Sequence, residues 1–326
     1  MFARKSSKHM LGVLVGGPAL AIWVVLGTCG ATPAVAAAPP PPPPPPPANP
    51  VIVFQSTDGL ALIVCDADGR NATEIVPATP GGSVYQISWS PDGGSIVYTH
   101  WDHGTAAEMH AVDVSVVNGV PVGSNLRTIP GSVGARGVAW SPLGDQIAFT
   151  TNAGDISVIP PTGGTRTVLW QSPSGDRADG ANLVAWSPSG NRIAAAVWIP
   201  GTTTNNYMIL DVASLQTTIV PLQMNPQPEA PQALEWARTS DTLAAVSWWT
   251  IGKRRDARAL YEVDIATGAT TVISTALGML TASPSPDDSL YVTSMGSRLV
   301  LSTINRATGQ VVNLGPRDTY RVAWRR

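Results

Sequence analysis

The residues best suited to metal or acid–base chemistry are three histidines and an aspartate close together in the chain. His100, Asp102, His103 and His110 fall within eleven residues, and imidazole and carboxylate are ligand types that bind transition metals. On one strand His100 and Asp102 would share a face, whereas His103 would point elsewhere. Histidines occur here on one repeat only, so we expect exposed loop histidines, with no metal and no cofactor.

The common catalytic motifs are absent from the sequence. It contains no Gly-x-Ser-x-Gly, no phosphate-binding loop, no His-Glu-x-x-His and no paired-cysteine zinc site. Cys29 and Cys65 are the two cysteines, and we expect Cys65 to be a small buried strand residue. No catalytic residue is therefore predicted, and a protein without enzymatic activity is favoured over an enzyme.

A second group of residues is suited to binding. These are tryptophans and arginines in or beside the longer connections between expected strands: Trp101, Trp198, Trp248, Trp249, Arg254 and Arg255. Exposed aromatic side chains near basic ones are typical of recognition surfaces. The alternative is that these tryptophans pack as extra core at the ends of the sheets.

These residues must be positioned by a repeat that runs through the chain. Trp-Ser-Pro-x-Gly occurs at residues 89–93, 140–144 and 186–190, with fainter copies at Trp236, Pro284 and Trp324. Successive copies start 51, 46, 50, 48 and 40 residues apart. A period in this range indicates a propeller, a solenoid or an array.

Each copy predicts four short strands separated by Gly, Pro, Asp or Asn. The turn prolines Pro91, Pro142 and Pro188 preset φ, and the tryptophans Trp89, Trp140, Trp186, Trp236 and Trp324 are large apolar plates suited to the wedge between sheets. In the four internal copies that keep Trp, the first aliphatic residue lies seven residues later. Aligning Leu290 with these residues makes the fifth copy, which has lost Trp, one residue shorter.

Counting the strands predicts how the ring closes. Residues 51–56 match a second strand without a leading strand, and residues 321–324 match a leading strand with nothing after it. Joined, they complete one blade, which makes six. The predicted fold is therefore all-β: a six-bladed β-propeller over residues 51–326, made of four-stranded antiparallel blades and closed by the C-terminal strand.

The repeat resembles a known family. Residues 89–93 and 96–99, together with the Tyr-x-Val-Asp-x-x-Thr-Gly of residues 261–268, are similar to the WD40-like repeat of TolB-type propellers. The resemblance covers residues 51–326, without the separate N-terminal domain of TolB. Repeats of this type occur in many exported proteins with different functions, so the resemblance implies fold more than activity.

The N-terminus predicts export. Residues 1–9 carry Arg4, Lys5 and Lys8, residues 10–30 are apolar, and Ala34-Val35-Ala36 offers a cleavage site, so residues 1–36 are a signal peptide or an uncleaved anchor. Cys29 follows a lipobox-like Leu26-Gly27-Thr28 and is a possible lipidation site. Residues 37–50 form an Ala/Pro-rich linker with nine consecutive prolines. Secreted actinobacterial proteins are similar in this respect. We expect an extracytoplasmic location: secreted, periplasmic or associated with the cell envelope.

Charge narrows the range of partners. After residue 50 the chain has 17 basic and 22 acidic side chains, a formal −5, and its basic residues are little clustered, so no nucleic acid is expected. We expect a monomer that touches membrane only through an uncleaved signal or a lipid. The predicted function is to bind a protein or envelope polymer through the aromatic loops. The alternative is a lyase or hydrolase acting at the axial funnel.

Overall fold

The structure, a computed structural model, describes residues 51–56, 61–78, 82–102, 104, 106–118, 120–171, 183–198, 205–223, 231–248, 257–315 and 319–325. The expected signal or anchor, the linker and Cys29 lie outside these ranges. Among the residues described, no helix is long and apolar enough to cross a membrane.

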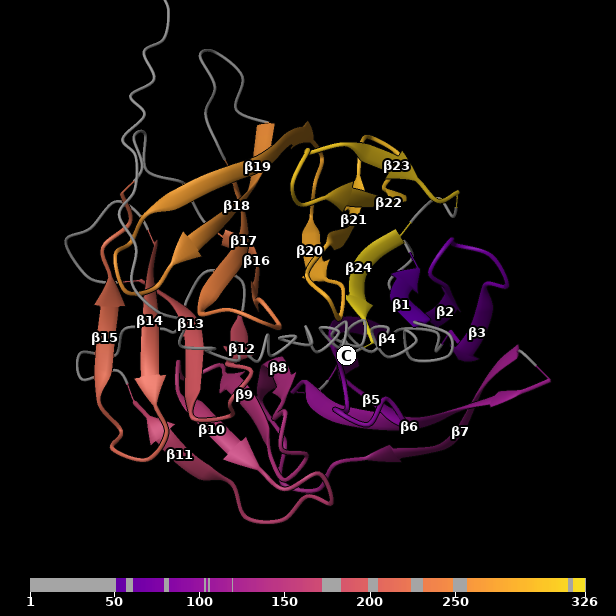
Figure 1. Ribbon diagram of the computed structural model, residues 1–326. Helices are drawn as coiled ribbons and strands as arrows, with labels where there is room; N and C mark the ends of the chain where they lie inside the picture. The colour runs from indigo at the N-terminus through magenta and orange to yellow at the C-terminus, as the bar shows by residue number, and fades with distance from the viewer. Residues whose placement is uncertain are drawn as a thin grey trace, which may run out of the picture. The chain divides into compact units, whose positions relative to one another are not determined.

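The described chain folds into six antiparallel sheets of four strands, which we call blades 1 to 6 (Figure 1). Blade 1 contains β24 (Thr319–Trp324), β1 (Val51–Ser56), β2 (Leu62–Asp66) and β3 (Thr73–Val76). Blade 2 contains β4 (Gly82–Trp89), β5 (Ser95–Asp102), β6 (Glu108–Val117) and β7 (Val120–Thr128). Blade 3 contains β8 (Ala135–Trp140), β9 (Ile147–Thr151), β10 (Ile156–Ile159) and β11 (Thr167–Trp170).

The remaining blades follow the same order along the chain. Blade 4 contains β12 (Val184–Trp186), β13 (Arg192–Trp198), β14 (Asn205–Asp211) and β15 (Thr217–Val220). Blade 5 contains β16 (Pro231–Trp236), β17 (Thr242–Trp248), β18 (Ala257–Asp264) and β19 (Thr270–Leu277). Blade 6 contains β20 (Thr281–Pro284), β21 (Leu290–Met295), β22 (Val300–Asn305) and β23 (Val311–Asn313).

The first strand of each blade lies at the centre of a closed ring (Figure 1). β4, β8, β12, β16 and β20 contact one another in that order, and β24 contacts both β20 and β4. β24 also pairs antiparallel with β1, at the other end of the propeller sequence. The six-bladed propeller and its closure by the C-terminal strand are thus confirmed.

One cross-strand pair recurs between the first and second strands of five blades. It joins the tryptophan of the first strand to an aliphatic residue of the second: Trp89 to Ile96, Trp140 to Ile147, Trp186 to Ile193, Trp236 to Leu243, and Trp324 to Ile52. All ten side chains are buried. Each tryptophan lies in an apolar cluster shared with a neighbouring blade, so the repeat motif fills the wedges between the sheets.

The indole N–H groups add bonds between some blades. Trp89 Nε1 donates to the Ala323 carbonyl at 3.4 Å, and Trp186 Nε1 donates to the Ala139 carbonyl at 3.1 Å. Both carbonyls belong to the first strand of the preceding blade. Trp140 Nε1 instead donates to Gly144 in its own turn, at 3.4 Å.

In blade 6 the large side chain of this pair lies on the second strand and the small one on the first. This corrects the expected alignment of the fifth copy. Pro284 stands at the tryptophan position and pairs with Tyr291, not Leu290. Tyr291 is buried, whereas Leu290 is half-buried. The copy therefore keeps the seven-residue offset (284 to 291), and the large side chain has moved from the first strand to the second.

The Trp-Ser-Pro turns are held by their own side chains. In blade 2, Ser90 Oγ donates to Asp92 Oδ1 at 2.6 Å and accepts from the Ser95 amide at 2.8 Å. Gly93 has a φ of 67°, a conformation that most other residues resist. The Trp-Ser-Pro-x-Gly motif therefore forms a stable tight turn.

We predict that ring closure depends on Trp324. Trp324→Ala removes a side chain that is 4% exposed and should lower the free energy of unfolding by about 3–5 kcal/mol. Val312→Thr, on the outer strand of blade 6, is a suitable control because Val312 is 50% exposed; it should change stability by no more than about 0.5 kcal/mol. Urea denaturation measures both, and equal losses would contradict this role of Trp324.

Cys65 is the buried strand residue expected from the sequence, since it lies on β2 with no exposed surface. Burial, with smaller contributions from the charges of Asp66 and Asp68, raises its pKa to about 12. The thiol therefore remains protonated at neutral pH, and only the thiolate is the reactive form.

The thiol of Cys65 should accordingly resist alkylation in the native protein. At pH 8 a pKa of about 12 leaves roughly one thiol in 10⁴ ionised. We expect iodoacetamide to label the peptide containing Cys65 only after unfolding in urea, as followed by mass spectrometry. Equal labelling rates in the native and unfolded states would contradict the assignment.

Candidate functional site

The antiparallel blades sort the connections onto two faces. The turns from first to second strand and from third to fourth strand share one side, which we call the turn face. The connections from second to third strand and from each fourth strand to the next blade share the other side, which we call the loop face. The Trp-Ser-Pro turns lie on the turn face, and the predicted binding residues are in or beside connections on the loop face.

Three of the predicted binding tryptophans occupy one register of the repeat. Trp101, Trp198 and Trp248 each lie twelve residues after the motif tryptophan (89 to 101, 186 to 198, 236 to 248), at or near the loop-face end of β5, β13 and β17. They pair with Ser83, Asn205 and Arg258 respectively. The fold therefore brings equivalent positions of blades 2, 4 and 5 to the same face.

Of these binding residues, the structure describes the side chain of Trp101. Trp101 is half-buried and has interactions within the structure. The side chains of Trp198 and Trp248 lie outside the described part of the chain, as do Trp249, Arg254 and Arg255. Their assignment to a binding surface stays a prediction.

Two of the histidines, His100 and His110, come together within blade 2. The rings of His100 and His110 lie 4.9 Å apart between centroids, and His110 Nε2 is 3.2 Å from Glu108 Oε1. His103 and the side chain of Asp102 lie outside the described residues. Among those described, no three His, Cys, Asp or Glu side chains gather around one point, so the expectation about metal remains untested for the full set.

A small cavity lies among the first strands of the blades, near the axis of the ring. It has a volume of about 20 Å³, which is room for about one water molecule. The lining includes Gln86, Glu235, Thr281 and Arg321, and the Arg321 guanidinium donates to the Gln232 carbonyl at 2.8 Å. Glu235 and Arg321 are the ionisable residues of its lining.

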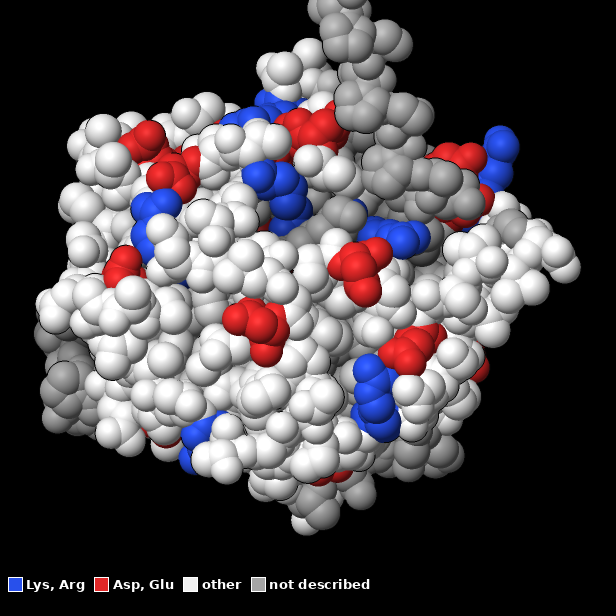
Figure 2. Space-filling view, turned by 60° about the horizontal axis from the view of Figure 1, so that its bottom comes forward, with Lys and Arg blue, Asp and Glu red and all other residues white. Residues whose placement is uncertain are grey.

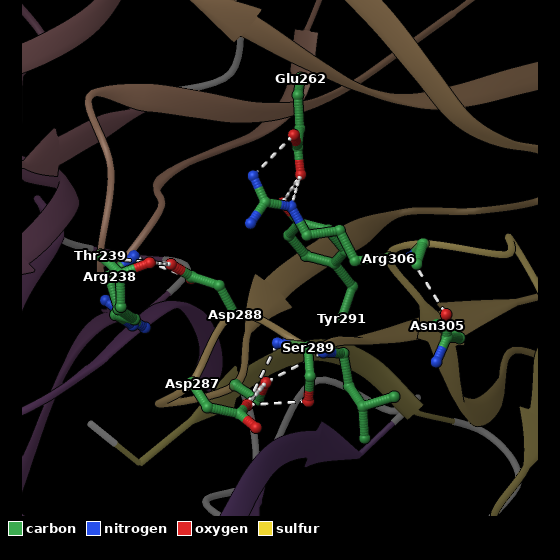
Figure 3. Close-up of polar contacts among 12 residues, drawn as sticks. Arg238, Thr239, Glu262, Asp287, Asp288, Ser289, Tyr291, Asn305 and Arg306 are labelled. Atoms are coloured by element: carbon green, nitrogen blue, oxygen red, sulfur yellow. Dashed lines mark hydrogen bonds and ion pairs between the residues drawn. The ribbon is translucent and has the colours of Figure 1, made fainter. Parts of the chain in front are cut away.

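A polar network connects blades 5 and 6 (Figure 3). Glu262 on β18 accepts from Arg306 Nε at 2.5 Å, from Arg306 Nη2 at 2.9 Å and from the Tyr291 hydroxyl at 2.5 Å. Burial, followed by the bond to Glu262, raises the pKa of Tyr291. The two hydrogen bonds that Arg306 donates to Glu262 raise the pKa of Arg306. The network satisfies the hydroxyl that Tyr291 brings into this wedge.

A second carboxylate links the turns of the same two blades. Asp288 stands at the position of the turn glycine, with a φ of 56° and 2% exposure. It accepts from the amides of Arg238 and Thr239 at 2.8 and 2.7 Å and from the Thr239 hydroxyl at 2.6 Å. Figure 3 shows Asp288 facing these residues. The bonds join blades 5 and 6 where the wedge lacks a tryptophan.

An open pocket of about 390 Å³ borders this network on the turn face. Its lining is Ile273, Asp288, Ser289, Asn305, Arg306 and Ala307. Arg306 and Asp288 are already bonded as above, and Asn305 Oδ1 accepts from the turn that follows it. Arg306 and Asp288 therefore serve the blade interface, and Asn305 holds its own turn. Sequence inspection missed the Glu262 network because its members come from two copies, blades 5 and 6.

Charge on the surface is mixed. On the face shown in Figure 2, acidic and basic side chains are interspersed among uncharged residues. Such a face has no broad patch of one sign that would attract a strongly charged polymer.

Comparison with known proteins identifies the fold. No protein-family model matches the chain, and no curated protein sequence matches it. TolB from Acinetobacter baumannii is similar in structure, with 15% identity and a TM-score of 0.63, covering 85% of this chain and 66% of TolB. This chain thus spans just under two thirds of that protein.

Two further solved structures are also similar to this chain. A chain from a nidogen/laminin complex has 13% identity and a TM-score of 0.62, covering 85% of this chain and 98% of that one. A putative TolB from Agrobacterium tumefaciens has 16% identity and a TM-score of 0.55, covering 82% and 88%. At these identities the likeness concerns the fold: a six-bladed β-propeller similar to that of TolB.

We predict that Glu262 stabilises the interface of blades 5 and 6. Glu262→Ala leaves the Tyr291 hydroxyl and the Arg306 guanidinium without their acceptor and should cost about 1–3 kcal/mol. Adding Tyr291→Phe should restore part of the loss, because the buried hydroxyl is then absent. Urea denaturation measures the effects, with the exposed Glu74 as a control in Glu74→Ala. Strict additivity of the two changes would contradict the proposed coupling.

Proposed function

We propose that this chain is a non-enzymatic binding propeller that holds a protein or envelope polymer on its loop face, outside the cytoplasm. The observation that carries the proposal is the shared register of Trp101, Trp198 and Trp248. Three tryptophans at equivalent positions on one face, outside the structural motif, form a set that blade packing does not require, because blades 3 and 6 have Asn152 and Gly296 there.

The small axial cavity among the described residues favours binding over catalysis. It has room for about one water, and its ionisable lining residues are Glu235 and Arg321. A wide face of aromatic side chains, by contrast, is the usual chemistry of protein recognition, in which a few tryptophans and arginines carry most of the energy. The structural likeness to a chain from a nidogen/laminin complex adds that this fold occurs in protein–protein assemblies.

The location rests on the N-terminal sequence. Residues 1–36 have the basic, apolar and small-residue regions of an export signal, and the nine prolines that follow suit a spacer between an envelope and a folded domain. Cys29 would anchor the chain if it carries a lipid. The similar TolB structures accord with this location.

We predict that the loop-face tryptophans are needed for binding and not for folding. The triple variant Trp101→Ala, Trp198→Ala and Trp248→Ala should lose capture of its envelope partner by at least about tenfold, since buried aromatic anchors each contribute more than about 1 kcal/mol. The full chain is used to capture partners from an envelope extract. The partner identified by mass spectrometry is then purified and titrated against both proteins.

The control for this experiment is Leu143→Ala. Leu143 is 67% exposed on the turn face, so its loss should leave capture unchanged. A large fall in the thermal midpoint of the triple variant would assign the tryptophans to the core. Unchanged capture by a folded triple variant would reject the loop face as the binding surface.

A further inference from the structure

Arg238 departs from the repeat in a way that packing does not explain. It stands two residues after Trp236, at the position of the turn prolines Pro91, Pro142 and Pro188. A proline there stiffens the turn, whereas an arginine adds a long charged side chain. The amide of residue 238 donates to Asp288, which explains why proline is absent, but that bond does not require a charged side chain, and such an unexplained departure points to a functional site.

The guanidinium of Arg238 has no hydrogen-bond partner among the described residues. The backbone amide of Arg238 donates to Asp288, but Nε is buried without an acceptor, and the side chain is half-buried. Burial lowers the pKa of Arg238, and the charges of Glu235 and Asp288 offset this only in part. A partly buried guanidinium is normally paired, so its free donors call for an acceptor.

Arg238 lines a pocket on the turn face. The pocket has a volume of about 140 Å³ and is formed by Pro142, Trp186, Pro188, Trp236, Ala237 and Arg238, from the turns of blades 3, 4 and 5. Its walls apart from Arg238 are proline rings, indole rings and a methyl group. An engineered apolar cavity of about 150 Å³ holds benzene, so the volume suits a small hydrocarbon group.

A second unused donor belongs to the same wall. Trp236 is 1% exposed, and its indole N–H has no acceptor among the described residues, unlike those of Trp89 and Trp186. The neighbouring guanidinium of Arg192 lies 5.2 Å from the Trp236 ring and is paired with Asp241 at 2.5 Å. Arg192 thus forms an ion pair, whereas the Arg238 guanidinium feels the charges of Glu235 and Asp288 without a hydrogen bond to either among the described residues.

We propose that this pocket binds the carboxylate of a small apolar group, with the carboxylate on Arg238 and the hydrocarbon part against the proline and indole walls. An arginine fork matches a carboxylate geometrically and forms bonds stronger than neutral ones. The same chemistry is offered by a free aliphatic acid and by the C-terminal residue of a polypeptide. The site is distinct from the loop face and does not depend on the function proposed above.

The first experiment titrates the full chain with N-acetyl-leucine and with N-acetyl-leucinamide, which lacks the charge. Tryptophan fluorescence and calorimetry follow binding, because Trp186 and Trp236 line the pocket. We expect saturable binding of the acid and at least about tenfold weaker binding of the amide. Equal binding of acid and amide, or binding of neither, would overturn the proposal.

Variants then assign the carboxylate to Arg238. Arg238→Gln keeps the backbone amide bonded to Asp288 and should reduce affinity for the acid at least about tenfold, while Arg238→Lys should retain part of it. Arg70→Gln is the matched control, since Arg70 also lies on the turn face, with a side chain 83% exposed and outside the pocket. Unchanged affinity in a folded Arg238→Gln protein, checked by its thermal midpoint, would refute the site.

A last comparison separates the two sources of the ligand. A four-residue peptide ending in leucine is titrated with a free and with an amidated C-terminus. Tighter binding of the free peptide than of N-acetyl-leucine would identify a polypeptide C-terminus as the ligand. Equal or weaker binding would identify a free acid. Either result supports a carboxylate site, provided that the amidated peptide binds at least about tenfold more weakly than the free one.

Discussion

The structure depends on filling the wedges between neighbouring blades. A four-stranded sheet has two faces, and a propeller buries both by placing each sheet against the next. Six buried clusters perform this task, each shared by two consecutive blades. In five of them a tryptophan from the first strand lies across from an aliphatic residue of the second. Because a buried Trp-to-Ala change costs about 3–5 kcal/mol, this pair sets most of what the repeat must preserve.

Blade 6 shows what happens when the constraint is met differently. Exchanging tryptophan and an aliphatic residue for Pro284 and Tyr291 keeps the wedge filled, but it brings a hydroxyl into an apolar place. That hydroxyl needs an acceptor, which Glu262 supplies, and the carboxylate in turn needs Arg306. The Asp288 bonds to blade 5 add a polar link at the interface where the wedge has no tryptophan. Moving the large side chain from the first strand to the second therefore accounts for this group of polar residues.

The sequence was sufficient to predict the fold, the number of blades and the closure by residues 321–324, because these follow from a repeat with fixed spacing. It was not sufficient to align blade 6, since a comparison of residue types could not show that Tyr291 replaces the volume of a tryptophan. The sequence also could not show that the Arg238 guanidinium lacks a hydrogen-bond partner, because its surroundings come from the turns of three blades. The register shared by Trp101, Trp198 and Trp248 was countable from the sequence, but its meaning required the two faces to be known.

The turn face mainly serves stability, whereas the loop face is free to serve recognition. On the turn face, serine, proline and glycine fix short connections, and this leaves little freedom for side chains to gain new roles. A site can arise there only where a copy abandons the motif, as blade 5 does at Arg238. On the loop face the connections are outside the motif, and the second strands end in different residue types: tryptophan in blades 4 and 5, but Thr151 in blade 3 and Met295 in blade 6. Substitution there leaves the wedges intact, so a binding surface can change while the ring persists, which explains how one fold can serve many partners.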